Sequence, residues 1–173
     1  RLASPEGISA GLFGGAIDYS VGNLLVGAFE TRVDTVCTGA AYLYLEDADG
    51  NFTLTNRFLP TDLNPQDFFG AEVSIHGQYI TISAPKWDAA DKDTDDGAVF
   101  LFEKKGGAWW SLGMISPPDL AANDHFGTDI EISDNFLIMG NHLDDAGAFN
   151  SGSVYVMDLD VNTGVEQFEG LTD

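Results

Sequence analysis

The sequence repeats one pattern three times, and this repetition limits the possible folds more than any other feature. A Phe-Gly pair occurs at Phe13-Gly14, Phe69-Gly70 and Phe126-Gly127, at spacings of 56 and then 57 residues. Each pair is followed by a short strand-like run, a tight polar turn and a second run. Self-similarity at a fixed period is the sequence signature of repeat architectures such as propellers and solenoids. We therefore expect three copies of one structural unit.

Each unit is expected to hold four short strands joined by turns. The runs are 15–19, 24–28, 39–44 and 52–59 in the first unit, 71–75, 79–85, 97–102 and 109–115 in the second, and 128–132, 136–141, 152–157 and 165–171 in the third. No stretch shows a sustained helical period, so the chain is predicted to be all-β.

The strands narrow the architecture to propeller blades. The runs 98–102 and 137–139 are apolar at every position, which fits a strand covered on both faces rather than a half-exposed one. Four-stranded antiparallel sheets stacked around an axis place their strands in this situation, as in a β-propeller. We expect one propeller segment over 1–173, with blades at about 12–59, 68–116 and 125–171.

The repeated elements resemble the FG-GAP repeat. In that repeat a Phe-Gly pair, an apolar strand, a Gly-Ala-Pro-like element and an acidic loop occur in this order. The Gly-Ala-Pro element is degenerate here, as Gly27-Ala28-Phe29, Ser83-Ala84-Pro85 and Gly140-Asn141-His142. The resemblance implies a blade of the kind found in integrin α heads and bacterial surface proteins.

Three blades leave two sheet faces without a neighbour. Propellers close with roughly four to eight blades. Exposed apolar patches larger than a few hundred Å² usually mark interfaces, and a bare sheet face would form such a patch. The chain is expected either to be a segment of a propeller of six or seven blades or to close one by pairing with a second copy. Further blades or a second copy would then cover the open faces, and the first residue, Arg1 in place of Met, favours the segment.

The charge balance excludes some partners. The 28 acidic and 7 basic residues give a formal net charge of −21, which repels nucleic acid and anionic lipid. No apolar run is long enough to span a bilayer, so membrane insertion is not expected.

The loop between the second and third strands of the second unit is a candidate Ca²⁺ site. It carries five carboxylates, namely Asp88, Asp91, Asp93, Asp95 and Asp96. Oxygen ligands at alternate positions suit Ca²⁺, which takes roughly six to eight of them. Asp96 stands where such a loop would need glycine, and a solvated acidic loop without metal is the alternative. In integrin-type members the resemblance places Ca²⁺ between the first and second strands, where the turns are too short here.

Two other acidic segments are weaker candidates. The loop 142–151 offers Asp144 and Asp145, whereas the loop 30–38 offers Glu30 and Asp34. The run 47–51 resembles the start of a calcium loop, but it lies where a hairpin is needed, and Asp-Gly is typical of hairpin turns.

Adjacent tryptophans begin the fourth strand of the second unit. Neighbouring residues on a strand point to opposite faces, so one of Trp109 and Trp110 is expected to be packed and the other partly exposed.

The function expected from these features is non-enzymatic recognition or adhesion on a secreted or cell-surface protein. The loops 86–96 and 142–151 would contact a protein or glycan partner, with Ca²⁺ as the expected cofactor stiffening them. No catalytic residue is assigned, because the three histidines occupy unrelated positions of the repeat and none lies in a nucleophile motif. The alternatives are a carbohydrate-active propeller enzyme that uses an acidic pair, and a purely architectural subunit.

Overall fold

The computed structural model describes residues 1–7, 11–33, 36–61, 63–88, 94–145 and 147–159. Within these ranges the protein consists of strands and connecting segments, and no helix has the length and apolar character needed to cross a membrane. The all-β prediction is confirmed.

The strands form three blade-like antiparallel sheets. The first contains β1 (Ile17–Ser20), β2 (Asn23–Ala28), β5 (Ala40–Glu46) and β6 (Phe52–Phe58), in that spatial order. The second contains β7 (Val73–His76), β8 (Tyr79–Ala84), β9 (Ala98–Lys105) and β10 (Ala108–Ile115). The third contains β11 (Asp129–Ser133), β12 (Phe136–Asn141) and β13 (Ser153–Asp158). These are blades 1, 2 and 3, and the strand predicted over 165–171 lies outside the described residues.

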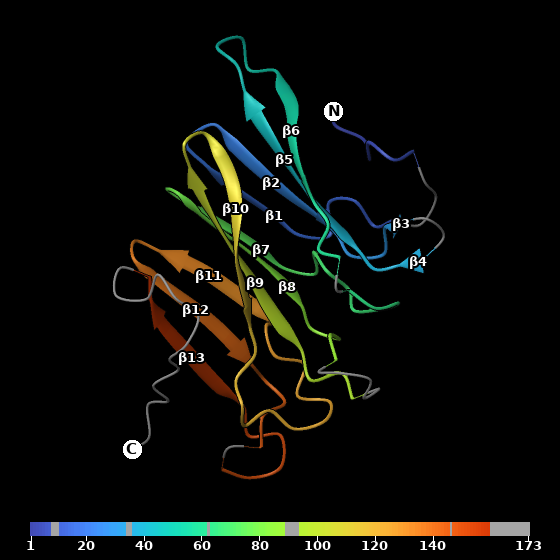
Figure 1. Ribbon diagram of the computed structural model, residues 1–173, viewed down its shortest axis with the longest axis vertical. Coiled ribbons are helices and arrows are strands. Elements are labelled where there is room, and N and C mark those ends of the chain that lie inside the picture. The colour runs from blue at the N-terminus through green and yellow to red at the C-terminus, as the bar shows by residue number, and fades with distance from the viewer. Residues whose placement is uncertain (8–10, 34–35, 62, 89–93, 146, 160–173) are drawn as a thin grey trace.

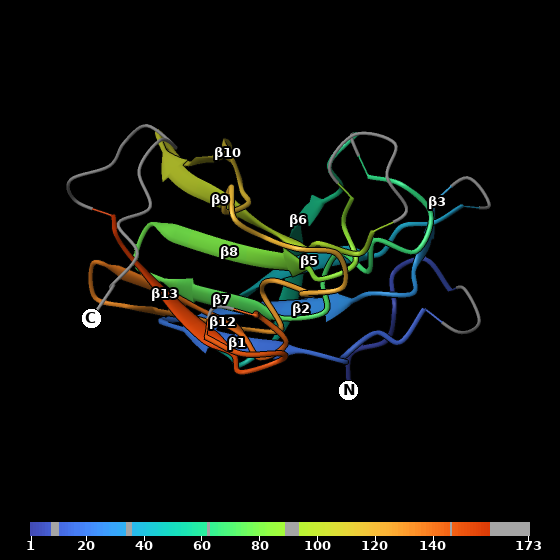
Figure 2. The same cartoon turned by 90° about the horizontal axis from the view of Figure 1, so that it is seen from below.

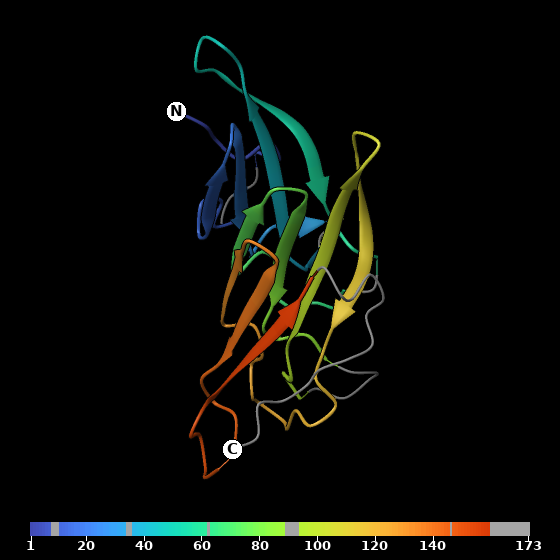
Figure 3. The same cartoon turned by 90° about the vertical axis from the view of Figure 1, so that its left-hand side faces the viewer.

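The blades stack in chain order into an open arc. Figure 1 shows blade 1 in blue to teal, blade 2 in green to yellow and blade 3 in orange to red. The first strand of each blade lies at the inner edge of the arc, where β7 contacts both β1 and β11. The outer strands β6 and β10 lie along the other side (Figure 3). The predicted propeller segment of adjacent blades is confirmed.

One short hairpin was not expected. Strands β3 (Arg32–Val33) and β4 (Val36–Cys37) pair antiparallel inside the segment that the sequence predicts only as an acidic loop. Val33 and Val36 pair with each other, and β-branched residues favour extended backbone.

Apolar side chains from facing blades form the core. Between blades 1 and 2, Leu43 and Phe58 pack with residues that include Ile75 and Ile82. Between blades 2 and 3, Val99 and Leu101 pack with residues that include Ile130. Consecutive residues of β9 therefore serve different interfaces, since Phe100 faces blade 1 and Leu101 faces blade 3. Blade 2 is the blade covered on both faces.

The Phe-Gly pairs dock each blade on the blade before it. Phe69 and Phe126 are fully buried, and they form parallel bridges to Gly39 and Gly97 of the preceding blade. Each phenylalanine also contacts an aromatic ring of its own blade, in the pairs Phe13–Tyr42, Phe69–Phe100 and Phe126–Tyr155. The glycine is needed where the blades touch, because a Cβ on Gly70 would collide with the carbonyl oxygen of Ala40.

A matched pair of substitutions tests this role of the Phe-Gly pair. Gly70 and Gly14 have nearly the same φ, 89° and 90°, but no atom lies within 4 Å of a Cβ built on Gly14. Gly14→Ala is expected to cost about 1–2 kcal/mol of unfolding free energy through its left-handed backbone alone. Gly70→Ala adds the collision with blade 1 and is expected to cost about 3 kcal/mol or more. Urea unfolding measures both values, and equal losses would contradict the docking role.

Candidate functional site

The long connections of all three blades lie at one end of the arc. The strands β2, β8 and β12 end there, and the segments 29–39, 85–97 and 142–152 lead from them to the third strands. We call the described parts of these three segments the loop rim. Figure 2 shows the segment with β3 and the segment after β8 on the same side of the molecule. In the part of the chain that the structure describes, the opposite end holds tight turns, such as Val21-Gly22 and Gly77-Gln78 between paired strands.

Hydrogen bonds tie the rim loops of blades 1 and 2 to the segment that leads into the next blade. Phe69 donates its amide to Thr38 O at 3.0 Å, and Phe126 donates its amide to Asp96 O at 2.9 Å. Asn123 likewise donates its amide to Thr94 O at 2.6 Å. The rim is therefore built partly by the contacts between blades.

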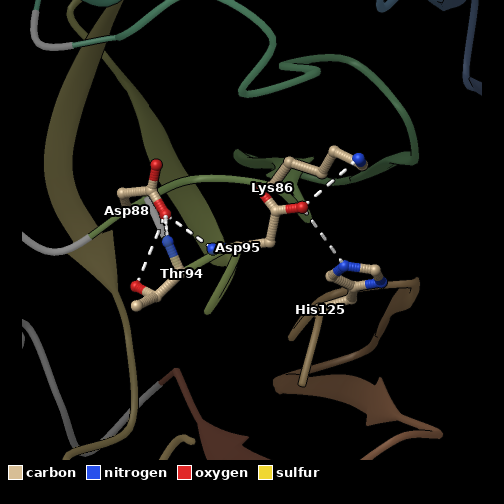
Figure 4. A network of polar contacts seen from close by, with 5 residues as sticks. All are labelled: Lys86, Asp88, Thr94, Asp95 and His125. Atoms are coloured by element: carbon tan, nitrogen blue, oxygen red, sulfur yellow. Dashed lines mark hydrogen bonds and ion pairs between the residues drawn. The ribbon is translucent and has the colours of Figure 1, made fainter. Parts of the chain in front are cut away.

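Asp88 holds the end of the second rim loop. Its Oδ1 accepts the backbone amides of Thr94 at 2.7 Å and Asp95 at 2.6 Å, and the Thr94 hydroxyl lies at 3.5 Å. These bonds span the stretch between the two described parts of the loop (Figure 4). These hydrogen bonds connect Asp88 to the residues that lead into β9.

The Asp95 carboxylate lies between Lys86 of its own rim loop and His125 of the segment that leads into blade 3. Its Oδ2 is 3.3 Å from Lys86 Nζ and 3.6 Å from His125 Nε2 (Figure 4). Lys86 also lies over the ring of Phe68, 5.3 Å from its centroid. His125 belongs to the linker into blade 3, so this network links the rim loop of blade 2 to blade 3.

The contacts of Asp88 and Asp95 affect whether these two carboxylates can bind Ca²⁺. Asp88 already accepts two amides, and Asp95 is paired with a lysine, whose charge opposes that of a cation. Among the described residues no three His, Cys, Asp or Glu side chains come together closely enough to hold a metal ion. Asp91 and Asp93 lie outside the described residues, and Asp96 is half-buried. Calcium binding by this loop stays a prediction.

The third rim loop uses its acidic residues in local hydrogen bonds. Asp144 is buried and accepts the hydroxyls of Ser153 and Tyr155, the latter at 3.2 Å, while Asp145 accepts the amide of Asn150 at 2.6 Å. Burial, together with the charges of Asp119 and Asp144, raises the pKa of Tyr155 to about 12. This hydroxyl therefore remains protonated at physiological pH.

A buried aspartate also stands beside this loop. The Asp124 side chain is buried and accepts the amide of Ala121 at 2.7 Å. Burial raises the pKa of Asp124, and the charges of Asp144, Asp145 and Asp96 raise it further. Several carboxylates therefore lie near Asp124 at the rim between blades 2 and 3.

An aromatic residue projects from the same loop. Phe149 is 86% exposed, in a stretch, 144–152, whose other residues are small, polar or acidic. Sequence reasoning missed Phe149, and it also missed Lys86 and His125 as partners of Asp95. The one sequence signal for an exposed Phe149 is that it lies within an acidic loop.

Two other sequence predictions are settled by the structure. Asp47 Oδ1 accepts the amides of Asp49 at 2.9 Å and Asn51 at 2.8 Å, which confirms a hairpin turn over 47–51. Trp109 packs against the core between blades 1 and 2, whereas Trp110 is 60% exposed. The expected division between the adjacent tryptophans is confirmed.

One carboxyl near the inner edge has a shifted pKa. Burial raises the pKa of Glu72, and the nearby charge of Asp129 in the next blade raises it further. A glycan hydrolase would need such an acid beside a second carboxylate. No other described feature is specific to that chemistry.

Comparison with protein families identifies the repeat. A family model described as FG-GAP repeat matches residues 52–102 and 109–157, which together make up more than half of the chain. Both matches run from the fourth strand of one unit into the third strand of the next. A comparison with curated proteins gave no match.

A titration with Ca²⁺ tests the predicted metal loop. If the loop 86–96 binds Ca²⁺ only in the folded protein, Tm rises with Ca²⁺ concentration and falls back with chelator, since a ligand of the native state stabilises it by mass action. Asp91→Asn is expected to weaken this rise, whereas Asp134→Asn, in a turn at the opposite end, leaves it intact. A Tm that responds neither to Ca²⁺ nor to chelator excludes the metal from the loop.

Proposed function

Since this chain belongs to the FG-GAP repeat family, we propose that it is a non-enzymatic recognition module of a secreted or cell-surface protein. The partner is a protein that binds at the loop rim. The family match supports an extracellular recognition role in general terms, and the choice of the rim comes from the distribution of loops and side chains.

The main support for this proposal is that the long loops lie at one end of the arc of blades, whereas the other end consists of short turns. One end consists of tight turns and hairpins, which offer little variable surface. The other end gathers the long segments of all three blades, anchored by interblade hydrogen bonds such as that from Phe126 to Asp96. Binding residues are commonly placed on loops that a rigid scaffold positions.

The side chains of the rim indicate the chemistry of the partner. Phe149 provides an exposed aromatic surface, and aromatic residues are enriched in the centres of protein interfaces. Asp145 is exposed beside it, and Asp144, Asp96 and Asp124 add negative charge. A partner with an apolar pocket rimmed by basic residues would complement this surface.

A pair of substitutions distinguishes rim binding from binding elsewhere. The chain is screened against purified extracellular proteins and a glycan array, and the affinity for each binder is measured again with Phe149→Ser and Leu45→Ser. Leu45 is the control because it is an exposed apolar residue, 48% accessible, near the opposite end. Phe149→Ser is expected to weaken binding about tenfold or more, and Leu45→Ser to leave it unchanged.

The results that contradict the proposal are specific. Equal effects of the two substitutions would place the binding site outside the rim. If the chain binds only glycans and cleaves them, the result would instead support the carbohydrate-active alternative. In that case Glu72 would be the first residue to replace.

A further inference from the structure

Each blade of this protein has two faces. We call the face turned toward the next blade the leaving face, and the face turned toward the preceding blade the entering face. The two interior interfaces each join a leaving face to an entering face. Among the described residues, no sheet covers the leaving face of blade 3 or the entering face of blade 1.

The leaving face of blade 3 has the same apolar pattern as the two paired leaving faces. By strand register, Val154 and Val156 correspond to Val99 and Leu101 in blade 2. Val99 and Leu101 are 0% and 1% exposed under blade 3, whereas Val154 and Val156 are 63% and 41% exposed. Phe136 of the same blade is also exposed. These side chains match buried interface residues but lack a covering sheet.

A recess marks the place that a Phe-Gly pair occupies in the interior interfaces. It has a volume of about 130 Å³ and is lined by residues that include Glu131, Gly140 and Val154. In the interface between blades 2 and 3, Gly127 nests at the corresponding place, against Ser83 and Val99. Gly140 and Val154 correspond to Ser83 and Val99. The recess at Gly140 and Val154 is therefore where the Phe-Gly pair of a following blade would bind.

Gly152 adds an independent sign at the same edge. Its φ of 79° is close to the 92° of Gly97. A Cβ on Gly97 would collide with the backbone of Phe126, whereas a Cβ on Gly152 would meet only atoms of its own loop. The glycine equivalent to Gly97 is therefore present in blade 3, but no backbone of a following blade lies against it among the described residues.

Hydrogen bonds link the inner strands β1, β7 and β11. Glu131 of β11 occupies the acceptor position that Asp18 and Ser74 occupy in β1 and β7. Asp18 Oδ2 accepts the Ile75 amide at 2.7 Å and the Ser74 hydroxyl at 3.2 Å. Ser74 Oγ in turn accepts the Ile132 amide at 3.0 Å. The corresponding residue of blade 3 is Glu131, which is exposed on the leaving face. A following blade would bring an inner-strand amide to this carboxylate.

The inner strand of blade 1 offers the matching half, whereas Tyr42 and Tyr44 on the same face are already buried in a cluster against which Leu2 and Phe13 pack. Ile17 and Tyr19 correspond to the buried Val73 and Ile75 of blade 2, but they are 68% and 52% exposed. The Tyr19 amide is bonded locally to Asp18 Oδ1 at 2.7 Å, where the equivalent Ile75 amide crosses to the preceding blade. The space in front of Gly14 is empty.

We propose that a second copy of this chain docks head to tail between these two faces. Phe13-Gly14 of one copy sits in the recess of the other, Ile17 and Tyr19 cover Val154 and Val156, and Glu131 accepts the Tyr19 amide. A second copy is the occupant because one chain carries both halves of an interface that it already forms twice. This assembly does not depend on the recognition role proposed for the rim.

The contact is heterologous, which gives it a distinctive test. Different patches meet, so repeated docking yields a closed ring or an open filament rather than an isologous pair. Val156→Asp removes the leaving face, and Ile17→Asp removes the entering face. Each variant alone can no longer associate, but a mixture retains one intact face of each kind and forms a 1:1 complex.

Light scattering coupled to gel filtration measures the outcome over a wide range of concentration. The wild-type chain is expected above its monomer mass of 18.5 kDa, with association strengthened by salt because both copies are acidic. Each face variant is expected at the monomer mass, and the mixture at twice that mass. Val36→Asp, an exposed valine on the β3–β4 hairpin, is the control and keeps the wild-type behaviour.

Three results would overturn the proposal. They are a wild-type chain that stays at 18.5 kDa at every concentration, association that survives in both face variants, and a mixture of the variants that remains monomeric. Thermal unfolding of each variant verifies that it is folded.

Replacement of Glu131 tests the polar contact without threatening the fold. Glu131→Ala removes the acceptor and is expected to weaken association about tenfold, which is the usual size for a hydrogen bond to a charged group. Glu131→Gln keeps an acceptor oxygen and is expected to retain most of the affinity. Equal affinities of both variants with wild type would exclude Glu131 from the interface.

Discussion

The structure depends on one constraint, namely that each sheet is apolar on both faces and must be covered by a sheet on each side. Successive residues of β9 illustrate this, because Phe100 packs toward blade 1 and Leu101 toward blade 3. A single sheet with such strands would expose two apolar faces to water, at a cost that grows with the exposed area. Stacking of blades is therefore the condition for folding, and the Phe-Gly pairs fix the distance and register of the stack.

The same constraint separates the two kinds of surface on this protein. The faces of the terminal blades repeat the chemistry of the interior interfaces, so they are suited to another blade. The loop rim does not take part in this stacking except through its anchoring bonds, and its side chains differ from blade to blade. Lys86 and Asp95 occupy it in blade 2, whereas Phe149 projects from it in blade 3. Assembly and recognition can therefore be assigned to different parts of the molecule.

Most of the fold could be predicted from the sequence because the repeat supplies each strand more than once. The runs that begin at Gly39, Gly97 and Gly152 identify one strand in three copies, and the structure places β5, β9 and β13 there. The β3–β4 pairing could not be predicted in this way, since within the described ranges it occurs in one copy only. Leu12, Phe68 and His125 share a left-handed backbone before each Phe-Gly pair, but these three residue types have no common sequence signal.

The candidate site was less predictable than the fold. The sequence identified the acidic loop after β8, but it could not show that Asp88 would cap two amides or that Asp95 would pair with Lys86. These contacts join residues six to nine positions apart in the same loop, and no local pattern specifies them. The chain of bonds from Asp18 through Ser74 to the Ile132 amide was also invisible, because residues about one repeat apart meet only when the blades are stacked.

Hydrogen exchange resolved by strand tests the central claim most directly. If coverage of both sheet faces is what stabilises a blade, the amides of β8 and β9 exchange slowest in the monomeric chain, because blade 2 has a neighbour on each side. The amides of β2 and of β12, in the blades with one open face, then exchange faster. Slower exchange in blade 1 or blade 3 than in blade 2 would contradict the account.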